Sequence, residues 1–305
     1  GSVSDGVKHA AVLLLFAYGV FAFLWAGDAV RRVRRGFPSP GPDRRMTEEP
    51  TGMPVKRTYD RIADHFASTR AYPWPEVTAF LDPDDADAAS RLDADAVDAL
   101  AGGARPALRG LPGGDSNPEP RSGVGLDLGC GNGRHAEPLS TVLDRVIGLD
   151  VSAALLRTAR SRARERESGA DPPHLLQADA VSLPVGAGTV DVAVYVATLH
   201  HLRPRSARVA SLSELSRVLA SGGRALVAAW STAHDRFDAE SGFDTTVPWT
   251  LPGGESVPRF YHIYDPAEFT ADVRASGLDP VATTESSGNC YAVVAPGDSG
   301  SEPPV

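Results

Sequence analysis

The stretch that decides the fold is Gly125-Leu126-Asp127-Leu128-Gly129-Cys130-Gly131-Asn132-Gly133. Apolar residues lead into a turn with glycine at every second position, and a helical pattern follows. Glycine lets the backbone of such a turn approach a ligand without a clash at Cβ. The first turn of a following helix also offers N–H groups that the helix itself does not use. The stretch therefore indicates a nucleotide-like ligand bound beyond the first strand of an α/β sheet.

Two common phosphate-binding motifs do not fit this turn. A dinucleotide site needs a third glycine in G-x-G-x-x-G, and this chain has Arg134 at that position. The sequence Gly-Lys-Ser/Thr, which a P-loop requires, does not occur. A hydride-transfer enzyme and three unrelated strand-end turns are the weaker alternatives.

Short apolar stretches alternate with helical ones from Gly123 onward. This alternation predicts a parallel sheet with helices on both faces. Strands are expected at 125–128, 145–149, 174–177, 190–195 and 224–229, with helices at 153–167 and 205–219; a strand at 261–264, a helix at 266–276 and a strand region at 281–295 should complete the sheet.

Acidic residues follow the next two strands. Asp150 ends the second strand and Asp179 the third. Because the carboxyl ends of parallel strands lie at one edge of a sheet, both acids should share a crevice with the glycine turn. Asp150 can accept hydrogen bonds from both hydroxyls of a ribose, and Asp179 with Ala180 can bind an adenine amino edge.

The arrangement resembles the Rossmann-like class I methyltransferases (type 11-like) that use S-adenosylmethionine. The resemblance implies a seven-stranded sheet and no metal. It also implies that Asp127 and the glycine turn hold the methionine end of the cofactor. The cofactor-binding residues that we expect are Asp127, Gly129, Cys130, Gly131, Gly133, Asp150, Val151, Asp179, Ala180 and Val196.

Flanking motifs narrow this resemblance. The motifs are Tyr59–Phe66, Ser68-Thr69-Arg70, Pro73-Trp74-Pro75, Ala197–His201, Val247-Pro248-Trp249 and Arg259–Tyr264. Together they resemble the wobble-uridine tRNA carboxymethyl methyltransferases of eukaryotes, over about 56–81 and 123–295. That family esterifies a carboxymethyl group on the wobble uridine. The chain departs from the family in the insertion at 82–122 and in Leu202, where eukaryotic members tend to carry Trp.

The methyl transfer that the resemblance implies needs no strong base, because the acceptor carboxylate is already an anion at neutral pH. It needs the carboxylate to be positioned in line with the methyl group. Arg70 is expected to hold it bidentately; an ion pair with Asp60 or Asp64 is the alternative. His200 is expected to position or polarise the substrate, with a backbone-satisfied histidine as the alternative. Further substrate-binding residues are expected to be Tyr59, Trp74, His201, Tyr261 and His262.

The family also implies a partner. Its eukaryotic members work with a small zinc-ribbon activator protein that adds a strand to the sheet edge. In this topology the edge strand is 174–177, and strand addition would cover an otherwise unpaired edge. Helix 153–167 is rich in arginine but also holds Glu165 and Glu167, so a solvated face is favoured over a tRNA track.

The N-terminal part differs from the rest. Ala10–Gly27 carries no charge, and Arg31–Arg35 follows. The pattern predicts a membrane-spanning helix with the catalytic domain on the cytoplasmic side; a buried helix, and translation from Met46, are alternatives. The expected organisation is a span with its basic flank at 1–35, a linker at 36–54 and a methyltransferase domain at 55–298, with a largely loose acidic insertion at 82–122. A short helix over 86–100 is the alternative within this insertion.

Composition sets the remaining limits. The two cysteines, Cys130 and Cys290, exclude a disulfide framework and a thiolate zinc site. The net charge is −9, aspartate outnumbers glutamate 26 to 13, and only two residues are lysine. This bias is typical of salt-loving organisms, where screening weakens any argument from charge against an RNA substrate. A membrane-associated methyltransferase for a quinone or lipid precursor, and a non-catalytic cofactor-binding protein, stay open as alternatives.

Overall fold

The computed structural model describes residues 53–112, 120–165 and 171–297. The apolar segment predicted to span a membrane, 10–27, lies outside these residues. Within the described ranges, no helix combines the length and the apolar character that crossing a bilayer requires.

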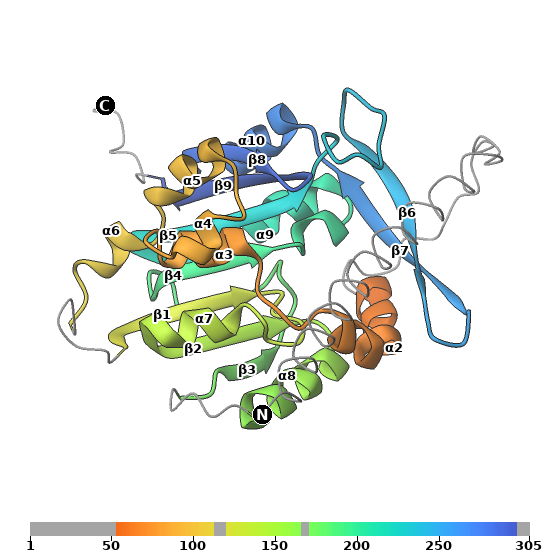
Figure 1. Ribbon diagram of the computed structural model, residues 1–305, viewed down its shortest axis with the longest axis horizontal. Helices are drawn as coiled ribbons and strands as arrows, with labels where there is room; N and C mark the ends of the chain where they lie inside the picture. The colour runs from red at the N-terminus through yellow and green to blue at the C-terminus, as the bar shows by residue number, and fades with distance from the viewer. Residues whose placement is uncertain (1–52, 113–119, 166–170, 298–305) are drawn as a thin grey trace, which may run out of the picture. The chain divides into compact units, whose positions relative to one another are not determined.

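A seven-stranded sheet forms the centre of the fold (Figure 1). Its strands are β1 (Arg121–Leu128), β2 (Leu143–Asp150), β3 (His174–Gln177), β4 (Val190–Val196), β5 (Leu219–Trp230), β8 (Leu278–Ser286) and β9 (Asn289–Pro296), in the order β3-β2-β1-β4-β5-β9-β8. The predicted α/β fold with seven strands is confirmed, and β3 is an edge strand as expected.

The sheet is mixed, which corrects the prediction of a parallel one. Strands β1 to β5 are parallel, but β9 runs antiparallel to β5, and β8 antiparallel to β9. The reason is the two-residue connection Ser287-Gly288, where both residues have positive φ. Such a tight turn can join only antiparallel strands, so the expected strand region at 281–295 folds as a hairpin.

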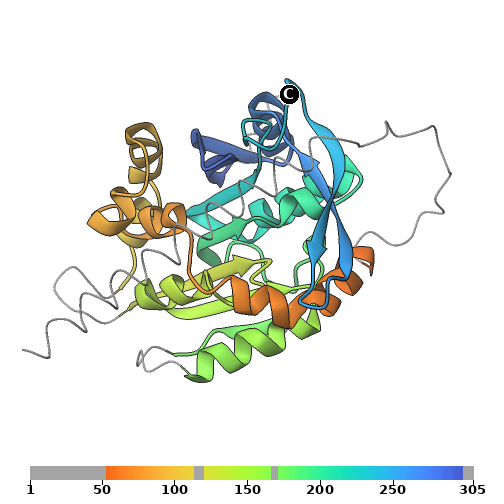
Figure 2. The ribbon, with the colours of Figure 1, turned by 45° about the vertical axis from the view of Figure 1, so that its right-hand side comes forward.

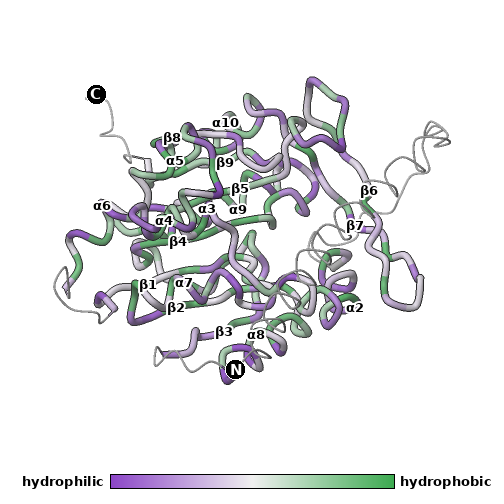
Figure 3. The backbone as a smooth tube through the Cα atoms, viewed as in Figure 1, coloured by the Kyte–Doolittle hydropathy of each residue, from purple (hydrophilic) through white to green (hydrophobic). Residues whose placement is uncertain are grey.

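Each face of the sheet carries its own core. Along β4, Val192 and Val194 face a core that α3 (Pro75–Leu81) and α7 (Ala136–Val142) cover. Ala193 and Tyr195 face the opposite core, under α9 (Arg205–Val218) and α10 (Pro266–Ala275). The central strand β4 is correspondingly largely green, that is hydrophobic, in Figure 3.

The segment after α3 is ordered where the composition predicted a loose insertion. It forms α4 (Ala86–Ala89), α5 (Ala94–Ala101) and α6 (Arg105–Leu108). Leu100 and Leu108 are buried in the same core as Phe80. Two of the aspartates that suggested solvation, Asp85 and Asp93, are N-caps that accept backbone N–H groups of the helices they precede.

Two elements outside the sheet lie beside its carboxyl edge. Helix α2 (Met53–Thr69) packs against α8 (Ala153–Glu165). Strands β6 (Phe243–Thr250) and β7 (Ser256–Ile263) form a separate hairpin next to α2 (Figure 2). Residues 261–264 therefore do not continue the main sheet as predicted. Tyr264 meets the sheet through a bridge to Ser231, and the Tyr261 ring packs against Trp230 at the end of β5.

We expect Leu100→Ala to lower the free energy of unfolding by about 2–4 kcal/mol, because it empties a fully buried leucine site. Urea unfolding followed by circular dichroism measures the change. The control is Asp98→Ala on the exposed side of the same helix. Equal, small effects of both variants would mean that α5 does not pack as described.

Candidate active site

One cavity of about 410 Å³ lies at the carboxyl ends of the parallel strands. Residues that follow β1, β2, β3, β4 and β5 line its floor. Helix α2 and strand β7 supply walls from outside the sheet. The site is therefore assembled from both halves of the described chain.

The glycine turn after β1 is held firmly in place. The N–H groups of Gly129 and Cys130 both donate to the carbonyl of Leu149, at 2.7 and 2.9 Å. A Cβ at Gly129, where φ is +75°, would lie 2.1 Å from the hydroxyl of Thr198. At Gly131 the nearest atom to a Cβ would be a ring carbon of Phe66, at 3.7 Å. The backbone at Gly131 is thus open for close approach of a ligand.

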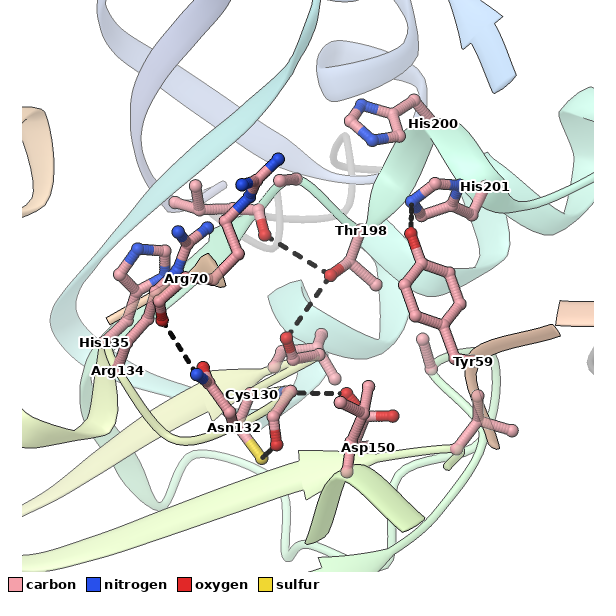
Figure 4. A pocket seen from close by; sticks show the side chains of 18 of the residues that line it. Tyr59, Arg70, Cys130, Asn132, Arg134, His135, Asp150, Thr198, His200 and His201 are labelled. Atoms are coloured by element: carbon pink, nitrogen blue, oxygen red, sulfur yellow. Dashed lines mark hydrogen bonds between the residues drawn. The ribbon is translucent and has the colours of Figure 1, made fainter. Parts of the chain in front are cut away.

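Two buried carboxyl groups stand beside this turn. Asp150 accepts from the N–H groups of Gly131 and Ser152, both at 2.8 Å (Figure 4). Burial raises the pKa of Asp150 to about 6. Burial, with the nearby Asp150 charge, raises the pKa of Asp127 to about 7. Oδ2 of Asp127 has no hydrogen-bond partner.

This wall suits a ligand with positive charge. Two carboxyl groups with raised pKa values gain the most from an approaching cation. Oδ1 of Asn132, at the same turn, is a second buried acceptor without a partner. The ammonium and sulfonium groups of S-adenosylmethionine supply the missing positive charges, so the residues present fit that cofactor.

Arginines gather on the other side of the cavity. Arg70 follows α2, and its guanidinium lies 5.3 Å from the centre of the Trp249 ring. It donates to the carbonyl of Thr69 and, among the described residues, faces no carboxylate within ion-pair distance. Asp60 instead binds Lys56 and Ser152, so the predicted alternative pairing of Arg70 with Asp60 is wrong.

Arg134 adds a second cation. It is buried, and its guanidinium lies over the Trp74 ring at 5.4 Å. Burial and the nearby Arg70 charge together lower its pKa to about 10, so Arg134 still carries its charge at neutral pH. In Figure 4 both arginines lie on the same side of the glycine turn.

Tyr59 and His201 form one hydrogen-bonded pair (Figure 4). Nδ1 of His201 lies 2.9 Å from the carbonyl of Phe260, which can only accept, so Nδ1 carries the proton. Burial lowers the pKa of His201 to about 3, so the ring is neutral. Its Nε2 therefore accepts from the Tyr59 hydroxyl, 2.7 Å away.

His200 carries its ring proton on the other nitrogen, Nε2 instead of Nδ1. The backbone N–H of Trp230 donates to Nδ1 of His200 at 3.0 Å. Burial holds the pKa of His200 well below its usual value, and the neutral ring must then carry its proton on Nε2. His200 is accordingly a hydrogen-bond donor toward the cavity, without a free basic nitrogen.

The structure brings most of the predicted site residues to this cavity. They are Tyr59, Arg70, Trp74, Gly129, Cys130, Gly131, Asp150, Val151, Asp179, Ala180, Val196, His200, His201 and Tyr261. Asp127 and Gly133 lie behind this lining. His262 differs from the prediction, because side chains alternate along β7: its ring is bound to Asp244 and Glu268 instead.

The residues at the cavity that were not predicted as site residues include Arg134, Arg259 and the bordering Trp249. Trp249 binds α2 by donating from Nε1 to Nδ1 of His65, at 3.1 Å. Arg259 is buried on β7 and lines the cavity. A signal for Arg259 was present, because it alternates in phase with Val257, Tyr261 and Ile263, the core-facing positions of a strand.

Comparison with known proteins gives the family context. Residues 126–227 match the family model described as "Methyltransferase domain". A "tRNA (carboxymethyluridine(34)-5-O)-methyltransferase" of Saccharomyces cerevisiae is 30% identical, over 67% of this chain and 59% of the relative. One of the same name in Schizosaccharomyces pombe is 26% identical, over 73% of this chain and 87% of the relative. The chain thus spans about three-fifths of the length of the first relative.

Solved structures support the fold. A structure described as "DhpI-SAM-HEP complex" matches with a TM-score of 0.55 and 22% identity, over 82% of this chain and all of that one. A complex between the Haloferax volcanii Trm112 methyltransferase activator and a putative methyltransferase matches with a TM-score of 0.51 and 16% identity, over 81% of this chain and all of that one. These comparisons confirm the predicted resemblance to S-adenosylmethionine-dependent methyltransferases, with the matched methyltransferase domain at residues 126–227.

Binding of S-adenosylmethionine should weaken as the pH falls from 8 to 5. Asp127 and Asp150, with raised pKa values of about 7 and 6, lose their charge in this range and with it their attraction for the cationic ligand. Each carboxyl group that must be ionised for binding lowers the affinity by up to about tenfold per pH unit below its pKa. Isothermal titration calorimetry measures the dissociation constant.

Asp127→Asn should bind more weakly at pH 8 and show a flatter pH dependence. Asp98→Asn, which changes an exposed acid on α5, should behave as the wild type. A wild-type dissociation constant that stays constant from pH 8 to pH 5 would contradict this assignment.

Proposed function

We propose that this S-adenosylmethionine-dependent methyltransferase esterifies a carboxylate on its acceptor, and that the acceptor is a carboxymethyl group of the wobble uridine in tRNA. The names of the relatives support this acceptor. The observation that carries the proposal is Arg70, a guanidinium at the cavity without a carboxylate partner among the described residues. It can receive the carboxylate of an incoming substrate in the two-pronged way that arginine favours.

The protonation states agree with a reaction that needs no base. Transfer of a methyl cation to a carboxylate oxygen releases no proton from the acceptor. His200 and His201 are both neutral, and Nδ1 of His200 and both ring nitrogens of His201 are already hydrogen-bonded. Tyr59, whose pKa burial raises, stays a neutral phenol. These side chains orient the acceptor and exclude water.

When bound, the cofactor supplies an electrophilic methyl group on a sulfonium. Asp127, Asn132 and the open backbone at Gly131 would hold its amino-acid end, and Arg134 its carboxylate. Asp150 and Asp179 would hold the ribose and the adenine. His200, after β4, would donate from Nε2 to the uridine of the acceptor.

Arg70 would contribute to methyl transfer by positioning the acceptor carboxylate. A cation on the acceptor carboxylate withdraws charge from the attacking oxygen, so tight pairing alone would slow the reaction. Positioning one oxygen in line with the methyl group can be worth far more than this loss. Arg70 is exposed, so its pairing with the carboxylate is weakened by solvent. Its removal should therefore affect binding more than the chemical step.

We propose a strand-adding activator as the protein partner, at β3. Among the strands that the structure describes, this edge strand has only β2 as a neighbour, and its Leu176 is an exposed large apolar residue. A partner strand would cover both the unpaired edge and Leu176. The Haloferax complex contains an activator and a methyltransferase of related fold, which supports this proposal. The alternative of a membrane-associated small-molecule substrate is not favoured by the named relatives.

Labelled methyl transfer tests the function. The protein, with a candidate activator present, should transfer labelled methyl to tRNA bearing a carboxymethyl wobble uridine and not to the same tRNA without that group. The label should leave as methanol in mild alkali, because the product is an ester. Alkali-stable label, or equal labelling of both tRNAs, would contradict an ester product.

Arg70→Ala should raise KM for the modified tRNA by tenfold or more, with a smaller fall in kcat, since charged hydrogen bonds contribute about 1.5–3 kcal/mol. Arg203→Ala, which removes an exposed arginine stacked on Phe260, is the matched control. Unchanged KM in Arg70→Ala would show that Arg70 does not bind the acceptor.

His200→Gln should keep more activity than His200→Leu, because the glutamine amide can replace the Nε2 donor. The kcat of the wild type should show no step between pH 6 and 9, since His200 stays neutral throughout that range. Initial rates across this range measure both effects. A step near pH 6.5 that disappears in His200→Gln would instead identify His200 as a base.

A further inference from the structure

Arg259 occupies an inward-facing position of β7, where the alternation along the strand otherwise places apolar residues. On β7, Val257, Tyr261 and Ile263 point inward, and Arg259 lies in phase with them. Its exposed fraction is 9%, against a usual preference of arginine for the surface. A cation at such a position needs a reason that packing does not supply.

The contacts of Arg259 leave its charge without an opposite partner. Its guanidinium carbon lies 4.8 Å from the centre of the Trp249 ring and 5.1 Å from that of Tyr261. Its Nε is buried without a hydrogen-bond partner, and its interaction with the neutral Tyr59 hydroxyl brings no opposite charge. No carboxylate of the described ranges forms an ion pair with it. Aromatic faces offset part of the desolvation, but a buried charge normally requires an anion.

The missing anion would lie in the cavity. Arg259 lines it, as Arg70 does, and both guanidiniums contact the same indole, that of Trp249. One cation comes from the end of α2 and the other from β7, so two independent elements direct positive charge to one place. Both guanidiniums lie against one indole, and no carboxylate of the described residues pairs with either, which favours a ligand that brings one.

We propose that Arg259 is a second binding residue for the acceptor carboxylate and sets the specificity of the site for an anionic acceptor. The inference rests on the proposed function and adds a residue to it. Arg70, which is exposed, can capture the carboxylate at the mouth of the cavity. Arg259, which is buried, discriminates, because a neutral group in its place would leave the cation unpaired.

A matched pair of ligands tests the proposal. The nucleosides 5-carboxymethyluridine and 5-carbamoylmethyluridine have nearly the same shape, and only the first is an anion. Both are titrated into the full chain loaded with S-adenosylhomocysteine, by isothermal titration calorimetry. We expect the wild type to prefer the acid by about tenfold or more. In Arg259→Gln the preference should fall to less than about threefold.

Two further variants separate a binding role from a structural one. Arg259→Lys keeps the positive charge but lacks the planar pair of N–H donors of a guanidinium, so its preference for the acid over the amide should be intermediate. Arg203→Gln removes the exposed arginine stacked on Phe260 of the same strand, and should keep the full preference. S-adenosylhomocysteine affinity and thermal unfolding report whether each variant is folded. If Arg259→Gln does not fold, Arg259→Lys decides the question.

The outcomes are distinct. A wild type that binds acid and amide equally would overturn the proposed carboxylate acceptor itself. A wild-type preference that survives in Arg259→Gln, or is unchanged in Arg259→Lys when the glutamine variant is unfolded, would overturn only the role of Arg259. If Arg259→Gln weakens binding of the 3′-phosphorylated nucleoside while leaving the acid-to-amide ratio intact, Arg259 binds a phosphate and the carboxylate assignment is wrong.

Discussion

The indole of Trp249 joins the parts of the molecule that make the cavity. Its Nε1 donates to His65 on α2, and its ring packs against Phe66, so the hairpin and the helix move together. The guanidiniums of Arg70 and Arg259 both make cation–π contacts with the same ring. The sheet alone supplies only the cofactor side of the site. The opposite side is formed by two elements that do not belong to the sheet, and the Trp249 contact is one of those that join them, beside the Arg61–Glu255 ion pair.

Apart from Arg134, which stands near Asp127, the charges discussed at the cavity are separated by sign. Asp127 and Asp150 stand at the ends of β1 and β2, whereas Arg70 and Arg259 come from α2 and β7. A cationic cofactor and an anionic acceptor would each be drawn to the wall of opposite charge. In the proposed reaction, the S–C bond that breaks and the O–C bond that forms would lie between the acidic and the basic side of the cavity. The two neutral histidines add no charge there. This division agrees with a reaction in which opposite charges cancel.

Much of the fold could be predicted because β1, β2 and β4 are short apolar runs, and because Gly129 follows β1 and Asp150 ends β2. The reversal of β9 could not, because it depends on the conformation of Ser287-Gly288. The order at 86–108 was missed because Asp85 and Asp93 look like solvated charges in a sequence and act as caps in the structure. His262 was misplaced, and Arg259 overlooked, because each depends on the phase of β7, which a motif alone does not give.

The pair of unpartnered arginines also bears on what happens after methyl transfer. Esterification removes the charge from the acceptor, so Arg70 and Arg259 would lose their attraction for the group they had just positioned. The desolvation of Arg259 would then act against the complex with the finished ester. Such a site would bind the neutral ester more weakly than the carboxylate, which would favour release of the product. Turnover would then need no separate opening of the hairpin from α2.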